Sequence, residues 1–168
     1  YPKIDALWER VAQNRINVFG TSAKYISSCR IGGVSDYAKN DFSSLRTVLS
    51  TGSPLLPEDF DYFYSRISPD HKIQLASISG GTDIVSCFML GCPTKPVVRG
   101  EIQCLGLGMD VKTFNEKGQE ITNEQGELVC TKPFPAMPLS FVKDPDFKKY
   151  EADYFTRFPG VWHHGDFI

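Results

Sequence analysis

The pattern of apolar, glycine and proline residues changes near Ile84, and this change limits the folds that the chain can adopt. Before that point, short apolar runs with strand character alternate with segments of helical periodicity. Such alternation favours a parallel sheet with helices packed on it. After it, short strand-like runs are separated by Gly and Pro, which is typical of antiparallel structure. We therefore expect an α/β fold, in which part of a doubly wound, mostly parallel sheet (1–84) precedes a smaller antiparallel β-barrel-like part (85–168).

Periodicity and turn residues place the individual elements. In the first part we expect helices over 2–11, 22–30 and 57–67, strands over 16–19, 45–49 and 73–78, a polar surface loop over 34–44, and turns over 50–54 and 79–83. In the second part we expect strands over 85–90, 101–105, 111–114, 127–132 and 160–163, a hairpin turn over 115–118, and a charged helical segment over 144–153.

The net charge and the cysteine content argue against several classes of protein. The 168 residues carry a formal net charge of −2, which gives no general attraction to nucleic acid or to anionic membranes. No apolar run approaches the roughly 20 residues that cross a bilayer. Five cysteines without a CxxC pair argue against a disulfide framework or a zinc site and favour a cytoplasmic protein. The start at Tyr1 rather than Met indicates a piece of a longer chain.

Two small-residue turns follow consecutive predicted strands. One contains Ser79, Gly80, Gly81, Thr82 and Asp83, and the other contains Thr51, Gly52, Ser53 and Pro54. Each could be an ordinary turn. However, ligands bind at the carboxyl ends of parallel strands, and a hydroxyl beside a carboxylate suits phosphate and Mg²⁺ chemistry. Because the two strands are consecutive, we expect both turns at the same edge of the sheet.

A third candidate is the segment from His163 to Asp166 near the end of the chain. Its aspartate follows a glycine at a predicted strand end and could accept both hydroxyls of a ribose. The two adjacent histidines do not suggest a shared metal ion, since neighbours on a strand point to opposite faces.

Four segments together resemble a known family. LRTVLSTGSPL, ISGGTD, GELVCTKPFP and FPGVWHHGD occur in the order and approximate spacing of the core motifs of adenylate-forming acyl-CoA synthetases. Within that superfamily they look most like the acetoacetate-activating ligases of ketone-body and fatty acid metabolism. The resemblance spans nearly the whole chain and implies a central fragment of the large AMP-binding domain. It also implies acetoacetate, ATP and coenzyme A as substrates and Mg²⁺ as cofactor.

The resemblance implies a role for each candidate residue. Thr82 matches the threonine that hydrogen-bonds the phosphate, and Asp83 matches the acid that holds Mg²⁺; these two are the catalytic candidates. Asp166 matches the acid that binds the ribose hydroxyls. The remaining ATP- and AMP-binding candidates are Gly52, Ser53, Pro54, Ser79 and Gly81. Thr51 and Gly80 fall where the acyl pocket is built, and a glycine at 80 leaves space that related acetate enzymes fill with an aromatic side chain.

Three positions depart from the usual family pattern. Most relatives have Glu where this chain has Asp83, so the shorter carboxylate is expected to hold the metal directly or through a water molecule. Ser79 stands where many relatives have an aromatic residue that stacks on adenine. His164 replaces the more usual Thr before Gly-Asp.

The family's remaining parts are expected outside this sequence. The phosphate loop is expected upstream of Tyr1, and the hinge and the lysine-bearing mobile domain are expected beyond Ile168. We therefore expect the chain by itself to be inactive. Two alternatives remain open, a ligase for another short or medium acyl chain and a non-catalytic nucleotide-binding or interaction module.

Overall fold

A computed structural model describes Lys3–Ile168, and these residues form two compact units. The first unit contains the residues up to Gly80 together with Met89–Cys104. The second contains Gly81–Phe88 and Leu105–Ile168. Among Lys3–Ile168, no helix has both the length and the apolar character needed to cross a bilayer.

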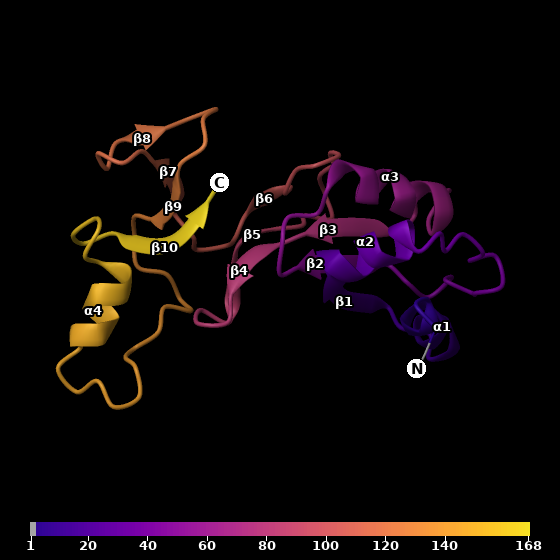
Figure 1. The fold of residues 1–168 in the computed structure, drawn as a ribbon, viewed down its shortest axis with the longest axis horizontal. Coiled ribbons are helices and arrows are strands. Elements are labelled where there is room, and N and C mark those ends of the chain that lie inside the picture. Colours follow the sequence, from indigo (N-terminus) through magenta and orange to yellow (C-terminus); the bar gives the residue numbers. More distant parts are fainter. Residues whose placement is uncertain (1–2) are drawn as a thin grey trace. The chain divides into compact units, whose positions relative to one another are not determined.

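The first unit is built on a parallel sheet (Figure 1). Its strands are β1 (Val18–Ser22), β2 (Thr47–Thr51) and β3 (Gln74–Ser77), hydrogen-bonded in the order β1-β2-β3. The parallel pairing confirms the prediction from alternating strands and helices. The first two strands begin two residues later than predicted. The apolar Ile16 and Leu45 lie in the segments that lead into the strands, where Leu45 is buried without joining the ladder.

Three helices accompany this sheet, α1 (Ala6–Gln13), α2 (Ala23–Ile31) and α3 (Pro57–Arg66). Two of them, α2 and α3, begin for a local reason. The Ser22 hydroxyl accepts a hydrogen bond from the backbone N–H of Tyr25 and so caps α2. Pro57 occupies the first turn of α3, where a missing N–H costs nothing.

The core of the first unit is rich in aromatic side chains around Trp8, which is completely buried. The ring of Trp8 lies within 6.1 Å of Phe19 and Tyr37, edge to face in both cases. Tyr37 corrects the prediction of a polar surface loop over 34–44, because only 3% of it is exposed. Its hydroxyl lies 2.7 Å from the hydroxyl of Tyr62 on α3. The loop is therefore anchored to the core through an aromatic residue that periodicity could not assign.

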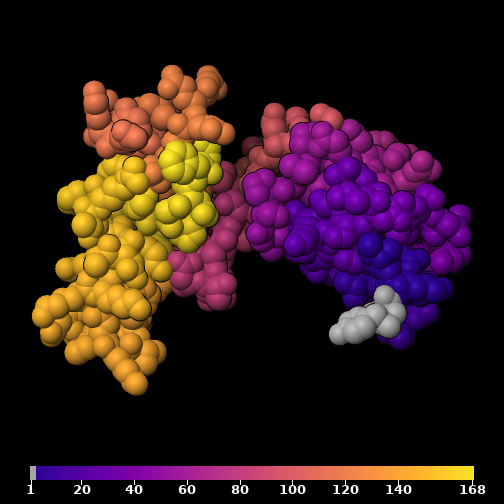
Figure 2. Space-filling view, in the orientation of Figure 1, coloured from indigo at the N-terminus to yellow at the C-terminus, as the bar shows by residue number. Residues whose placement is uncertain are grey.

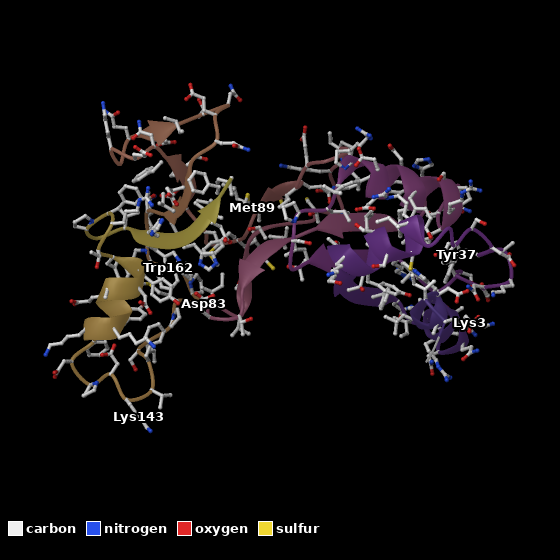
Figure 3. All side chains as sticks on the ribbon, viewed as in Figure 1. Lys3, Tyr37, Asp83, Met89, Lys143 and Trp162 are labelled. Atoms are coloured by element: carbon white, nitrogen blue, oxygen red, sulfur yellow. The ribbon has the colours of Figure 1, made fainter. Side chains whose placement is uncertain are left out.

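The second unit contains an antiparallel sheet in the order β10-β9-β7-β8 and one helix. The elements are β7 (Val111–Phe114), β8 (Glu120–Ile121), β9 (Glu127–Cys130), α4 (Lys148–Tyr154) and β10 (Trp162–Phe167). The predicted turn at Asn115–Gly118 joins β7 to β8 and is confirmed by the hydrogen bond from Gly118 N–H to Asn115 C=O. The loop before α4 projects from the surface of this unit, with Lys143 at its tip (Figures 2 and 3).

The described strands do not close into the expected barrel. The four-stranded sheet stays open, with β10 and β8 as its edges, and β8 has two residues. A closed barrel with a filled interior takes about eight strands. The antiparallel character is confirmed, and the barrel-like closure is not found among the described residues.

A further three-stranded sheet has the order β4-β5-β6, with β4 (Ser79–Gly81), β5 (Ser86–Leu90) and β6 (Cys104–Leu105). Two predictions are corrected here. The segment 79–81 is a strand rather than part of a turn, because strand pairing uses the backbone and needs no large side chain. The strand expected over 101–105 is limited to its last two residues.

Candidate functional site

The carboxyl ends of β2 and β3 lie side by side in the first unit. Ser50 is in register with Ser77, and the N–H of Ile78 donates to the carbonyl of Ser50 at 2.9 Å. The segments that follow the two strands therefore leave the sheet at one edge, as their order in the sequence predicts. In open α/β sheets this edge is where ligands bind.

The candidate residues at the end of β2 and in the turn that follows it are all exposed. Thr51 is the last residue of β2, and Gly52 follows with φ of +86°, a conformation that favours glycine. Ser53 and Pro54 complete the turn. After β3 the chain enters β4, where Ser79 and Gly80 are half-buried strand residues.

The second unit contains the other candidates, beginning with Gly81 and the turn Thr82–Val85. The N–H of Val85 donates to the carbonyl of Gly81 at 3.1 Å and closes the turn. Val85 has φ of +48°, which a β-branched residue rarely adopts, and its side chain is almost fully exposed. Backbone strain of this kind is frequent at functional sites. Thr82 is exposed in this turn.

Asp83 is held by groups that are distant in sequence. Its Oδ2 accepts a hydrogen bond from the hydroxyl of Tyr154 at 2.7 Å. Its Oδ1 approaches the backbone of Gly81 so closely that a Cβ at that position would collide with it and with the ring of His164. A larger residue at 81 would therefore displace this carboxylate or the ring of His164.

The imidazole of His164 lies between two carboxylates. Its Nδ1 is 3.8 Å from Oδ2 of Asp83, and its Nε2 is 3.7 Å from Oδ2 of Asp166. One face of the site is closed by Phe88, whose ring centroid is 4.6 Å from that of His164. Only 10% of the His164 side chain is exposed, and Nδ1 is buried without a hydrogen-bond partner among the described residues. Asp83 and Asp166 are thus brought to the two sides of one ring.

An irregularity in β10 produces this arrangement. His163 pairs with Val129 and Phe167 with Glu127, so that the three residues between them stand opposite Leu128 alone. Gly165, with φ of +89°, allows the bulge. Bulges redirect side chains and are common beside active sites. The strand was predicted to end at His163, whereas it continues through Asp166 to Phe167.

Sequence reasoning did not identify Tyr154. Its ring stacks on Trp162 with centroids 3.8 Å apart. Figure 3 shows where Trp162 and Asp83 lie in the second unit. Burial raises the pKa of the Tyr154 hydroxyl, and the hydrogen bond to Asp83 raises it further, so the group remains a proton donor at neutral pH. The density of aromatic residues from Tyr150 to Phe158 was the available signal.

A separate polar cluster in this unit also escaped sequence reasoning. The buried carboxylate of Glu127 lies 2.7 Å from Nη1 of Arg157 and 2.9 Å from Nε2 of His163. The two adjacent histidines therefore contact different carboxylates. Glu127 is 3% exposed and its neighbours are protein groups, so we interpret this cluster as structural.

The donor set at Asp83 fits Mg²⁺ chemically. Carboxylate oxygens are hard ligands, and Mg²⁺ in nucleotide sites is commonly bound by one or two carboxylates with water and phosphate. Oδ2 of Asp83 accepts from Tyr154, Oδ1 has no hydrogen-bond donor among the described residues, and 26% of the side chain as a whole is exposed. In the described part of the chain, no three His, Cys, Asp or Glu side chains form a metal-binding group.

Comparison with known sequences confirms the resemblance seen in the motifs. The chain is 57% identical over 166 residues to the acetoacetyl-coenzyme A synthetase of Rhizobium meliloti (strain 1021), which covers 99% of this chain and 25% of the relative. It is 45% identical over 166 residues to the acetoacetyl-CoA synthetase of Danio rerio, covering 99% of this chain and 24% of the relative. The chain therefore spans about a quarter of the length of these relatives. No family model matches the chain.

Solved structures agree with the fold. Acetoacetyl-CoA synthetase from Streptomyces lividans aligns with a TM-score of 0.90 and 43% identity, covering 100% of this chain and 26% of that protein. The anthranilate CoA ligase AuaEII, in complex with anthranoyl-AMP, aligns with a TM-score of 0.79 over 98% of this chain and 29% of that protein. At 16% identity, the second likeness supports the fold alone.

Proposed function

We propose that this chain is a segment of an acetoacetate–CoA ligase, an enzyme that activates acetoacetate with ATP and passes the acyl group to coenzyme A. In the first step a carboxylate oxygen of acetoacetate attacks the α-phosphorus of ATP and pyrophosphate leaves. In the second step the coenzyme A thiol attacks the acyl carbon, loses its proton and displaces AMP. The proposal draws on the acetoacetyl-CoA synthetases that the chain resembles over 99% of its length.

The observation that best supports a nucleotide site is the approach of Asp83 and Asp166 to opposite sides of His164. The motifs assign one of these acids to the metal and the other to the ribose. Such acids must act on one nucleotide and so must lie near one another. They come from segments at opposite ends of the second unit's sequence, yet share one neighbouring ring.

The chain's own groups then have the following roles. Asp166, with 62% of its side chain exposed, accepts hydrogen bonds from the ribose hydroxyls. Thr82 donates its hydroxyl hydrogen to a phosphate oxygen, and Asp83 binds Mg²⁺ directly or through water. When bound, the metal neutralises charge that accumulates on the phosphates during attack. The motifs assign the contacts with adenosine to Gly52, Ser53, Pro54, Ser79 and Gly81.

The choice of acyl substrate is assigned to Thr51 and Gly80. A glycine adds no side chain to the wall of the pocket, which leaves room for the ketone-bearing acetoacetate. The partners proposed are three small molecules, acetoacetate, ATP and coenzyme A, and the cysteine content favours the cytoplasm as compartment.

The test uses the full-length protein that carries this segment. Pyrophosphate release is compared with acetoacetate, butyrate, propionate and acetate as acids. The highest kcat/KM is expected for acetoacetate, and Gly80→Trp is expected to shift preference toward acetate by closing the pocket. A protein that binds no acyl-AMP mimic, and loses nothing on Asp166→Ala, would contradict the proposal. The isolated chain is expected to form no acetoacetyl-AMP.

A further inference from the structure

We infer that Tyr154 and His164 are positioning residues that hold the carboxylates of Asp83 and Asp166 for magnesium-bound ATP, and that Asp83 and His164 form a pair matched in size. The inference rests on the proposed function and deepens it. It follows from contacts within the second unit that the motifs do not specify.

The first support is the restraint that Tyr154 places on Asp83. The hydroxyl donates to Oδ2 at 2.7 Å, and the ring that carries it lies flat against the buried Trp162. A hydroxyl on a stacked ring has little freedom to move. The hydrogen bond therefore fixes one carboxylate oxygen and directs the other away from Tyr154.

The second support is the position of His164. Its nitrogens are 3.8 Å and 3.7 Å from the two carboxylates, which is beyond hydrogen-bond distance but within contact of the ring. The ring is held edge to face by Phe88 and is nine-tenths buried. It therefore acts as a spacer that sets the separation of Asp83 and Asp166.

The third support is the close packing of both side chains against Gly81. Oδ1 of Asp83 and the Cε1 and Nε2 atoms of His164 all lie against the backbone of Gly81, where they exclude even a Cβ. One more methylene at position 83 would displace the carboxylate from this contact. A smaller side chain at position 164 would leave the carboxylate without its neighbour. The short acid and the large ring therefore complement each other in size.

The first experiment removes the hydrogen bond in the full-length protein. Tyr154→Phe is compared with Tyr150→Phe, a control on the same helix whose hydroxyl bonds the carbonyl of Pro138 instead. ATP binding is measured by calorimetry against Mg²⁺ concentration, and AMP binding is measured without metal. Tyr154→Phe is expected to raise the half-saturating Mg²⁺ concentration about tenfold, as for loss of a hydrogen bond to a charged group. AMP binding should change by less than about twofold, and Tyr150→Phe should change neither.

The second experiment tests the matched pair with a double-mutant cycle. Asp83→Glu and His164→Thr are each expected to raise the half-saturating Mg²⁺ concentration about fivefold, and the combined variant should return to within about twofold of the wild type. Melting temperatures identify any variant that fails to fold. If Tyr154→Phe does not fold, the double-mutant cycle of Asp83 and His164 still tests the inference.

The outcomes separate the inference from the proposed function. If the wild type binds neither ATP nor an acyl-AMP mimic, the function fails. If it binds both, but Tyr154→Phe has the Mg²⁺ requirement of the wild type and the single effects of the pair simply multiply, the positioning roles are wrong while the function stands.

Discussion

The two units each hold an aspartate in a polar contact with a hydroxyl, but the surroundings differ. Asp59 in the first unit is fully buried, and both its oxygens are occupied, Oδ2 by the hydroxyl of Ser27 at 2.6 Å and Oδ1 by Nε of Arg30 at 2.7 Å. Asp83 in the second unit has one oxygen bonded to Tyr154, and 26% of its side chain is exposed. The first carboxylate is saturated by the protein, whereas the second keeps an oxygen for a ligand.

This difference separates a structural acid from a binding acid on physical grounds. Asp59 joins α2 to α3, because Ser27 and Arg30 lie on α2 and Asp59 lies on α3. Asp83 lies in a turn with a strained residue, Val85, beside a bulged strand. A saturated acid stabilises the fold, while an unsaturated acid in a strained turn is suited to bind a cation. The comparison predicts that replacing each acid affects a different property.

The largest effect is expected at Asp83. In the full-length protein, Asp83→Asn should lower kcat/KM for acyl-adenylate formation by about 100- to 1000-fold, or about 3–4 kcal/mol, because a charge that stabilises the transferring phosphate is lost. The amide keeps the shape of the carboxylate, so the melting temperature should stay within about 2 °C of the wild type. Pyrophosphate release and calorimetric melting measure the two quantities. A large drop in melting temperature with retained activity would reverse the assignment.

Asp59 should show the opposite behaviour. Asp59→Asn is expected to lower the free energy of unfolding by about 2–3 kcal/mol, since it weakens a buried ion pair whose arginine, with 30% of its side chain exposed, can still be hydrated. The exposed pair of Asp61 with Arg99, on the same unit, supplies the matched control, and Asp61→Asn should change stability very little. Urea unfolding of the full-length protein measures both. Equal losses for the two variants would remove the distinction between saturated and exposed acids.

Two buried serines extend the comparison to neutral groups. The hydroxyl of Ser50 is buried without a hydrogen-bond partner among the described residues, whereas the hydroxyl of Ser68 accepts from the N–H of Ile73 at 3.1 Å. Ser68→Ala should therefore destabilise the protein by about 1–2 kcal/mol, and Ser50→Ala should be neutral or stabilising by up to about 1 kcal/mol. Denaturation midpoints compare the two. A loss at Ser50 as large as at Ser68 would indicate that the Ser50 hydroxyl has a partner.

Elements that depend on residues close together in the sequence could be predicted, whereas elements that depend on distant residues could not. Helices α2 and α3 and strand β3 were predicted to within one residue at each end, because the cap at Ser22, the proline at 57 and apolar periodicity act within a few residues. Helix α1 was predicted in type, but it begins four residues later than expected. The strand Ser79–Gly81 was missed because two glycines and a serine are typical of turns. Its pairing depends on backbone partners that local sequence does not reveal.

The site was predictable as a set of residue types but not as a geometry. The motifs identified Asp83, Thr82 and Asp166 by resemblance, and their roles stay predictions. The contact of Tyr154 with Asp83 joins positions far apart in sequence, and the bulge at Gly165 depends on register with β9. Both arise from packing, which composition and spacing do not encode.

The smallest effect is expected at Asp110, an acid of the second unit that contacts protein groups while remaining partly exposed. The hydroxyl of Thr131 donates to its carboxylate at 2.8 Å, and this bond, together with Lys132 nearby, lowers the pKa of Asp110. A carboxyl whose pKa is lower in the folded state adds stability above its unfolded pKa of about 3.9, and this contribution is lost as the pH falls through the folded pKa. Asp110→Asn should therefore lower stability slightly at pH 7 and flatten its fall below about pH 4. Urea unfolding midpoints measured from pH 7 to pH 3 test this, with the exposed Asp153→Asn as control. If the midpoints of Asp110→Asn and of the wild type fall equally between pH 4 and pH 3, the prediction is wrong.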